Sequence, residues 1–155
     1  VHGVSWTQAR EFAQWVGAEL PSEAQWEFAA TSRGNDQRYP WGNEAPDCER
    51  THNYSCPGAI TATVCTHPTG NSAQGVCDLA GNAWEWVLDN YHSTYENAPI
   101  DGSAWCNLAG CVDDGTPRVW KGGDYLRDVL KLRASARGNY GAAAQQPWVG
   151  FRLVR

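Results

Sequence analysis

The apolar residues near the amino terminus recur with the spacing of α-helices. Within residues 5–17 they fall three or four positions apart, with Ser5 suited to cap the start and Gly17 suited to end the helix. The apolar positions of this segment are Trp6, Ala9, Phe12, Ala13 and Val16. Residues 21–31 follow, and Pro21 suits a first helical turn. The pattern predicts two consecutive helices, the first of them amphipathic.

Three short segments further along the chain have the composition of β-strands. They are residues 83–87, 118–121 and 149–154, and turn-forming residues separate them. In the first segment two Trp side chains fall on one face and Glu85 on the other, because side chains alternate along a strand. Two helices followed by short antiparallel strands make an α+β fold.

Turns and loops occupy most of the remaining chain. Residues 32–77 carry dense turn signals, and the spans 90–117 and 137–148 are also rich in turn-forming residues. A long irregular segment is uncommon in a compact domain, so we expect disulfides, Trp packing or bound ions to hold residues 32–77 in place. The 155-residue length predicts one domain over residues 1–155.

Aromatic residues replace much of the aliphatic material of an ordinary core. The chain has nine Trp and six Tyr, and its 16 Gly and eight Pro are spread throughout, which argues against a helical bundle. It has no apolar run long enough to span a membrane, so we expect no membrane insertion. Val1 opens in the middle of a pattern, and we therefore expect a processed or excised piece whose export signal and first elements lie upstream.

Six cysteines lie in loop-like surroundings. An even number in this context favours disulfides and hence an oxidising compartment, that is, an extracellular, periplasmic or cell-surface location. The spacing makes three local pairs the simplest arrangement, although other connectivities are open. These pairs are Cys48–Cys56, Cys65–Cys77 and Cys106–Cys111. The alternative is zinc, but the chain has no CxxC pair and neither His52 nor His67 completes a familiar ligand spacing.

Charge is unevenly distributed along the chain. Residues 1–117 carry 15 acidic and four basic side chains, whereas residues 118–155 carry two acidic and eight basic ones. A basic terminal segment can indicate an anionic partner. With a sequence pI near 5.3 and no nucleic-acid-binding motif, we instead expect these arginines to pair with carboxylates of the acidic part, and we expect no nucleic-acid partner.

Six blocks of sequence, taken in order, resemble one protein family. They are VSWTQAREFAQWVGAELPSEAQWEFAA (4–30), YPWGNE (39–44), GVCDLAGNAWEWVLD (75–89), RVWKGG (118–123), LRASAR (132–137) and VGFRLV (149–154). The chain resembles the formylglycine-generating enzyme and sulfatase-modifying factor superfamily. This resemblance implies a loop-rich variant of the C-type-lectin-like fold, here without the strands that usually precede the first block.

The resemblance also implies oxidase chemistry, from which this chain departs. Family members that oxidise a Cys to formylglycine hold copper(I) with two thiolates spaced C-x4-C just after the GG of the RVWKGG block. Residues 124–133 occupy this stretch and contain no Cys, so we expect no copper. The C-x4-C spacing of Cys106 and Cys111 lies before that block and predicts a disulfide instead.

Other branches of the superfamily are iron-dependent sulfoxide synthases. Their iron is held by histidines that come largely from a separate domain, and the scattered histidines of this chain do not resemble that ligand set. The four are His2, His52, His67 and His92. We therefore assign no catalytic residue, which favours a protein that is not an enzyme.

One metal site of the family matches this chain. The resemblance implies a structural calcium held by carboxylates at the two ends of residues 78–85 and by backbone carbonyls between them. The matching positions are Asp78, Gly81, Ala83 and Glu85. Glu85 lies between two Trp residues that are expected to be buried, and a buried carboxylate needs a cation or several donors. An Arg from residues 118–155 or a backbone cap is the alternative to calcium.

Polar and aromatic side chains fill the stretches between the carboxy-terminal blocks. We expect the frame arginines Arg118, Arg133, Arg137 and Arg152 to be structural. Between them lie side chains that we expect to be partly exposed and suited to recognition. The predicted ligand-binding residues are Asp124, Tyr125, Arg127, Asp128, Lys131, Asn139, Tyr140, Gln145 and Trp148. The alternative is an ordinary exposed surface.

The sequence thus favours a secreted, disulfide-bonded, non-catalytic module that binds a protein or a small molecule. Residues 124–131 and 139–148 form the predicted surface, on a scaffold for which calcium and an arginine or backbone cap at Glu85 are equal alternatives. Two alternatives remain open. One is an oxidase whose catalytic groups lie outside this piece. The other is a structural accessory domain of a larger surface or signalling protein.

Overall fold

The computed structural model describes residues 1–58 and 60–155. The chain forms two compact units, each with most of its contacts inside itself. The first, the sheet unit, consists of Val1–Trp26, Glu85–Lys121 and Gly138–Arg155. The second, the loop unit, consists of Glu27–Trp84 and Gly122–Arg137. The chain crosses between the units four times along its length.

The two predicted helices are present as α1, Trp6–Trp15, and α2, Glu23–Ala30. Both begin with the same reciprocal cap. The Ser5 hydroxyl accepts from the Gln8 backbone N–H at 3.2 Å, and the Gln8 side chain accepts from the Ser5 N–H at 3.0 Å. Ser22 and Gln25 repeat this exchange at 3.0 and 2.9 Å. These caps satisfy backbone N–H groups that have no partner inside the first helical turn.

The apolar stripe of α1 is buried at three of its predicted positions. Trp6, Ala9 and Ala13 are the buried residues. Phe12 was predicted on the same stripe but is 45% exposed. It lies at the edge of the buried stripe, where its ring packs against that of Phe151 with centroids 5.8 Å apart.

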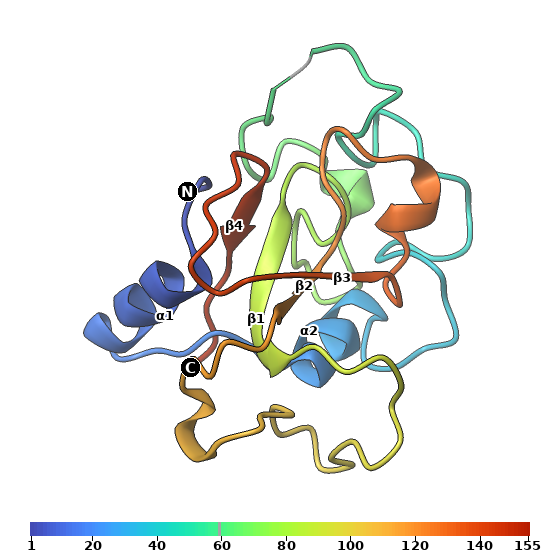
Figure 1. Ribbon diagram of the computed structural model, residues 1–155. Coiled ribbons are helices and arrows are strands. Elements are labelled where there is room, and N and C mark those ends of the chain that lie inside the picture. Colours follow the sequence, from blue (N-terminus) through green and yellow to red (C-terminus); the bar gives the residue numbers. More distant parts are fainter. Residues whose placement is uncertain (59) are drawn as a thin grey trace. The chain divides into compact units, whose positions relative to one another are not determined.

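A four-stranded sheet forms the centre of the sheet unit (Figure 1). Its strands are β1 Trp84–Asn90, β2 Arg118–Lys121, β3 Arg137–Tyr140 and β4 Val149–Phe151, in the order β3-β2-β1-β4. β1 and β2 are antiparallel, with Glu85 opposite Lys121 and Trp86 opposite Trp120. The α+β class and three of the strands therefore follow the sequence prediction.

Strand β3 was not predicted, because its residues lie in a turn-rich span. Gly138 explains how it joins the sheet. A Cβ at this position would lie 1.9 Å from Nε1 of Trp120, so only Gly allows the strand to approach the ring this closely. Tyr140 then stacks on Trp120 with ring centroids 5.5 Å apart.

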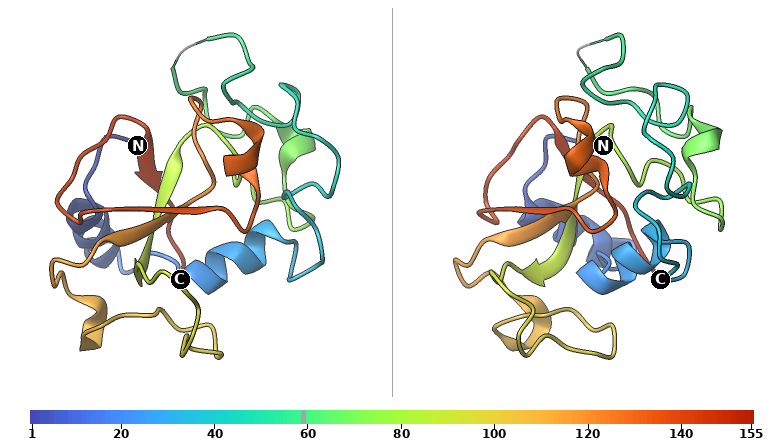
Figure 2. Two further views of the ribbon diagram at one scale, coloured as in Figure 1. Left: turned by 45° about the vertical axis from the view of Figure 1, so that its right-hand side comes forward. Right: turned by 90° about the vertical axis from the view of Figure 1, so that its right-hand side faces the viewer.

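The connection from β1 to β2 is a long loop that leaves the sheet and returns to it, as both views of Figure 2 show. Arg118 at the start of β2 anchors this loop by hydrogen bonds. Its buried guanidinium donates to the Leu88 carbonyl at 2.9 Å and to the Cys111 carbonyl at 3.3 Å, and lies 4.0 Å over the Trp6 ring. Burial lowers the pKa of Arg118, but Asp113 and Asp114 oppose this and favour the charged form. Arg118 is therefore structural, as predicted.

The loop unit is mostly irregular, as predicted for residues 32–77. Among its described residues, the elements that lie wholly within it are short 3₁₀ turns at Pro68–Gly70 and Val129–Leu132. Tyr39, Ala80 and Leu132 form a small core in this unit. Trp41 covers it, with its ring stacked on that of Tyr39 at 5.1 Å.

All six cysteines are paired in the three disulfides that the spacing predicted. Cys48–Cys56 and Cys65–Cys77 staple the loop unit, and Cys106–Cys111 closes a turn in the β1–β2 connection. The predicted pairing is thereby confirmed, and disulfides are present among the three means expected to hold the long irregular segment. In the disulfide form these cysteines have no thiolate for zinc.

Candidate functional site

Residues 124–131 form a closed loop on the loop unit. Gly123 lies at its base with a φ of +75°, and a Cβ there would lie 2.8 Å from the Lys131 carbonyl oxygen. The two ends of the segment therefore approach within contact distance. This geometry requires Gly at position 123 on two grounds, the backbone angle and the close approach.

Asp124 is buried, which corrects our expectation that it is partly exposed. Its Oδ1 accepts from the Leu126 backbone N–H at 2.7 Å, and its Oδ2 lies 3.5 Å from Nε of Arg127. Burial raises the pKa of the Asp124 carboxyl, while these hydrogen bonds and the nearby guanidinium partly offset that increase. Asp124 is buried because its carboxylate points into the turn and accepts the backbone N–H of Leu126 there.

The remaining side chains of the loop point mostly to solvent. Tyr125 is half-buried, with its ring 6.5 Å from that of His52. Asp128 caps the 3₁₀ turn by accepting from the Leu130 N–H at 2.8 Å. The exposed residues are Leu126, Arg127, Asp128, Val129, Leu130 and Lys131. The loop thus mixes apolar and charged groups on a short, anchored segment.

Residues 139–148 belong to the sheet unit. Tyr140 is 46% exposed and is held by its stack on Trp120, and Asn139 is half-buried. Gln145 is exposed and donates to the Gln8 side chain at 2.9 Å. Trp148 is half-buried, and among the described residues its indole nitrogen has no hydrogen-bond partner. Since the two predicted binding segments lie in different units, their joint surface stays a prediction.

Glu85 is buried, as expected, but an arginine satisfies it. Arg152 donates from Nε to Oε2 at 2.5 Å and from an Nη to Oε1 at 2.6 Å, and the Trp26 indole donates to Oε2 at 2.7 Å. This is the Arg alternative to calcium. A guanidinium on both carboxylate oxygens repels a cation and occupies the lone pairs that would bind it.

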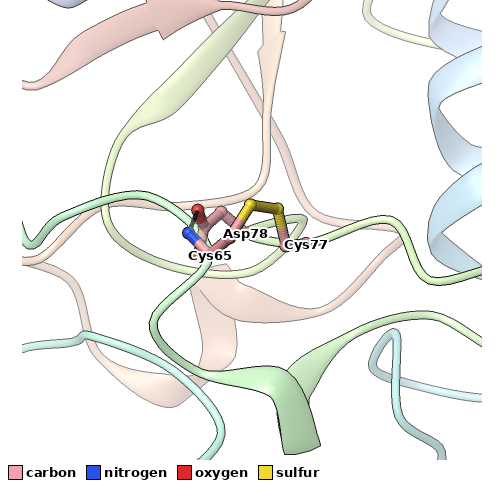
Figure 3. A group of neighbouring side chains, drawn as sticks. All are labelled: Cys65, Cys77 and Asp78. Atoms are coloured by element: carbon pink, nitrogen blue, oxygen red, sulfur yellow. Dashed lines mark hydrogen bonds between the residues drawn. A yellow bond between two sulfur atoms is a disulfide. The ribbon is translucent and has the colours of Figure 1, made fainter.

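The other predicted calcium ligands are also engaged locally. Figure 3 shows Asp78 beside the Cys65–Cys77 disulfide, and its Oδ2 accepts from the Cys65 N–H at 2.7 Å. The Gly81 carbonyl accepts from the Ala83 N–H at 2.8 Å. The sulfurs near Asp78 are bonded to each other, so they offer no thiolate. Asp78, Gly81 and Glu85 therefore each have a hydrogen-bond partner within the chain, and calcium at this position stays a prediction.

A buried charged cluster in the sheet unit was not predicted. Lys121 has no exposed surface, and its Nζ lies 3.5 Å from Oε1 of Glu23, which also accepts from the Tyr95 hydroxyl at 2.8 Å. Asp89 accepts from the Glu23 and Trp105 backbone N–H groups, and burial raises its pKa. The sequence carried one sign of this cluster. Lys121 ends a predicted strand and lies between Trp120 and Gly122, which are not the neighbours of a typical exposed lysine.

Comparison with known proteins identifies the family. The model of the sulfatase-modifying factor enzyme 1-like domain matches residues 1–155. The chain belongs to this family. Its resemblance to formylglycine-generating enzymes, inferred above from six blocks, is confirmed. Family membership alone does not separate enzymes from binding domains, because function depends on the site and not on the fold.

Curated relatives of this sulfatase-modifying-factor-like domain differ in their named activities. The chain is 36% identical to the serine/threonine-protein kinase Pkn1 of Chlamydia trachomatis, over 100% of this chain and 24% of the kinase. It is 34% identical to a formylglycine-generating enzyme of Thermomonospora curvata, over 79% of this chain and 43% of the enzyme. The chain thus spans less than half the length of these relatives.

Among solved structures, PvdO from Pseudomonas aeruginosa is similar with a TM-score of 0.85 and 27% identity. The match covers 99% of this chain and 60% of PvdO. It confirms that the domain has a fold of the formylglycine-generating-enzyme type. Within the part of the chain that the structure describes, no helix has the length and apolar character of a membrane span.

Proposed function

We propose that the domain is a non-catalytic module that binds a protein or a small-molecule ligand through its exposed loop side chains. The observation that carries this proposal is the loop of residues 124–131. Where the family resemblance implies a copper-binding Cys pair, this loop presents Leu126, Arg127 and other non-thiol side chains to solvent. The six cysteines are all in disulfides, so none supplies the thiolate that copper(I) prefers.

The loop has the properties of a recognition surface. Its base is fixed by Gly123 and by the buried Asp124, and its tip exposes both apolar and charged groups. An anchored loop loses less conformational entropy on binding than a free one. In the sheet unit, Tyr140 is held by its stack on Trp120 and Trp148 is half-buried, and such aromatic side chains suit contact with a ligand at low entropic cost.

Three disulfides support an extracellular or periplasmic location for this module, because such bonds persist in oxidising compartments. The similarity to a quarter of a protein kinase favours a second role, that of an accessory domain attached to a larger signalling protein. In that role the exposed loop contacts another part of the same protein.

The first experiment measures metal content, free thiols and oxidase activity of the full-length protein purified from its source. We expect no free thiols after denaturation and no conversion of a cysteine-containing peptide to formylglycine when copper(I) is added. Stoichiometric copper or iron together with peptide oxidation would overturn the non-catalytic proposal.

A second experiment tests the loop itself. Proteins cross-linked to the full-length protein are compared with those cross-linked to a Leu126→Ser/Val129→Ser variant, which removes exposed apolar surface from the loop. Val64→Ser is the matched control, because Val64 is 66% exposed in the same unit but lies outside the loop. We expect a specific cross-linked partner to be lost only in the loop variant. Retention of every partner by that variant would argue against the loop as the binding site.

A further inference from the structure

The loop unit contains a polar cavity of about 750 Å³. One wall is the end of α2 and the turn that follows it, with Asp36 and Arg38. The opposite wall is formed by Leu130, Arg133 and the residues after them. Apart from Leu130, the cavity shares no residue with the loop of residues 124–131. It is therefore a separate site, and it does not rest on the proposed function.

The wall that follows α2 is held in a defined shape. Ser32, Arg33 and Gly34 have successive positive φ angles of 52°, 73° and 79°, which reverse the chain sharply after the helix. The Gln37 side-chain amide then donates to the Tyr39 and Pro40 carbonyls at 2.9 and 3.0 Å. These contacts fix the wall before any ligand arrives, so binding need not order it.

A backbone hydrogen bond joins the two walls. The Ala134 N–H donates to the Arg38 carbonyl at 2.8 Å. Because Ala134 follows Arg133, this bond brings the backbone at Arg133 close to the backbone at Arg38. Tyr39 is buried at the same place, in the small core with Leu132. The cavity is therefore lined by two segments distant in sequence that the fold holds together.

Four charged side chains line the cavity, and three of them, Asp36, Arg38 and Arg133, are available to a ligand, whereas the half-buried Glu27 already has an interaction partner. Among the described residues, Asp36 and the Arg38 guanidinium have no hydrogen bond or ion pair, and Arg133 donates only from Nε to the Leu130 carbonyl at 3.2 Å. Arg50 in the same unit contrasts with them, because it is paired with Glu44 and Asp47. The forked guanidinium groups of Arg38 and Arg133 thus keep the donors that bind a carboxylate.

The balance of charge restricts the ligand class. A purely anionic ligand meets the carboxylates of Asp36 and Glu27, and a purely cationic one meets two arginines. A ligand with both signs of charge finds an opposite charge for each of its own. The cavity also offers the Asn35 amide and the Ser135 hydroxyl for hydrogen bonds, and Leu130, 58% exposed, for one apolar contact. Amide groups and a single apolar side chain are features of a short peptide.

We propose that this cavity binds a short zwitterionic peptide. Arg38 and Arg133 hold its terminal carboxylate, and Asp36 holds its terminal ammonium. The polar side chains of the cavity pair with its peptide bonds, and Leu130 contacts its side chain. The volume lies in the range of small-molecule sites, about 300–1,000 Å³, and accommodates a few residues of peptide.

The test is a titration of the full chain with the tripeptide Ala-Leu-Ala, followed by amide chemical shifts in NMR spectra. We expect shifts concentrated at residues 34–39 and 130–135, and affinity about tenfold weaker for the carboxy-amidated or the amino-acetylated peptide. Arg133→Gln is expected to weaken binding of the free peptide and to reduce the effect of amidation, because Arg38 remains as the second partner of the carboxylate. Asp36→Asn is expected to do the same for acetylation.

Arg33→Gln is the matched control, because Arg33 is an exposed arginine on the same turn that does not line the cavity. It is expected to bind the peptide as the unchanged protein does. All three substituted positions are at the surface, and thermal unfolding checks that each variant remains folded. Equal affinity for the free and both capped peptides, or equal weakening by Arg33→Gln and Arg133→Gln, overturns the proposal. Unchanged affinity after acetylation alone identifies a plain anion site and overturns it as well.

Discussion

Buried charges in this domain are satisfied by partners that are distant in sequence. Glu85 on β1 is held by Arg152 just after β4, 67 positions further along the chain. The burial of Glu85 followed from its two Trp neighbours, but its partner did not. Sequence spacing shows which carboxylate needs a donor, whereas the fold decides which of several arginines reaches it. Calcium and arginine were for this reason equivalent alternatives in the sequence.

Replacing Arg152 with Gln tests this pair. We expect Arg152→Gln to lower the free energy of unfolding by about 3 kcal/mol, because it leaves the mostly buried Glu85 carboxylate without its cation. Urea denaturation at neutral pH measures the change. The double variant with Glu85→Gln is expected to lose less than the sum of the two single changes. Glu44→Gln is the control, because the Glu44 side chain is 73% exposed in its ion pair with Arg50, and the expected change is below about 0.5 kcal/mol.

Asp124 makes stability depend on pH. Burial raises its pKa in the folded protein above the ordinary value of 3.8, so the folded state binds the proton more tightly than the unfolded state does. This contribution to stability is therefore present at low pH and is lost as pH rises from 3.8 through the raised pKa. Asp124→Asn removes the titration and keeps an oxygen for the Leu126 N–H.

The expected result for Asp124→Asn is a stability relative to the unchanged protein that increases with pH. Urea denaturation at intervals from pH 4 to pH 8 measures this difference, and Asp128→Asn controls for the loss of a nearby exposed carboxylate. Curves that run parallel for Asp124→Asn and the unchanged protein would show that Asp124 does not titrate differently in the folded state.

At the scale of elements, local signals were sufficient for the helices and insufficient for the sheet edge. The Ser-x-x-Gln caps at Ser5 and Ser22 act within one turn, so both helices were readable from the sequence. The second begins at Glu23, so Pro21, predicted in its first turn, lies before the cap. Strand β3 has no such local signal. It exists because Gly138 allows contact with Trp120, a residue 18 positions earlier. The loop of residues 124–131 was placed correctly, but the inward direction of Asp124 depends on hydrogen bonds that spacing does not reveal.

Gly138→Ala tests the attachment of β3. We expect it to cost at least about 2 kcal/mol of unfolding free energy, because the added Cβ overlaps the Trp120 ring and forces strand and ring apart. Thermal or urea unfolding monitored by Trp fluorescence measures the loss. Gly141→Ala is the matched control, since no described atom lies within 4 Å of a Cβ there and its φ is not positive. A change within about 1 kcal/mol is expected for it. Equal costs for the two variants would contradict the packing explanation.

At the scale of the whole molecule, the disulfides were the most predictable long-range feature. Each closes a loop of 5, 8 or 12 positions, and short loops are the easiest to close by chance, so the nearest pairing was correct. The division of the chain into a sheet unit and a loop unit was not predicted, because it depends on which distant segments share contacts. The polar cavity was missed for the same reason.

Removing one disulfide measures how much its cross-link contributes to the stability of the loop unit. We expect the Cys65→Ser/Cys77→Ser variant to lose about 2 to 3 kcal/mol of unfolding free energy, through the greater freedom of its unfolded chain. Urea denaturation of the oxidised variant provides the value, and mass spectrometry after alkylation checks that the other two disulfides remain. A loss below about 0.5 kcal/mol would mean that the long irregular segment is held mainly by its packing.

The contact between Gly123 and the Lys131 carbonyl means that the chain enters and leaves the exposed loop at nearly the same point. The separation of these ends does not depend on how many residues lie between them. Extra residues inserted at the tip cost little free energy, because loop-closure entropy grows only slowly with length. The domain can therefore exchange this stretch for peptides of other lengths and compositions while the frame beneath keeps its geometry, which makes residues 125–130 a natural position for engineering new specificities.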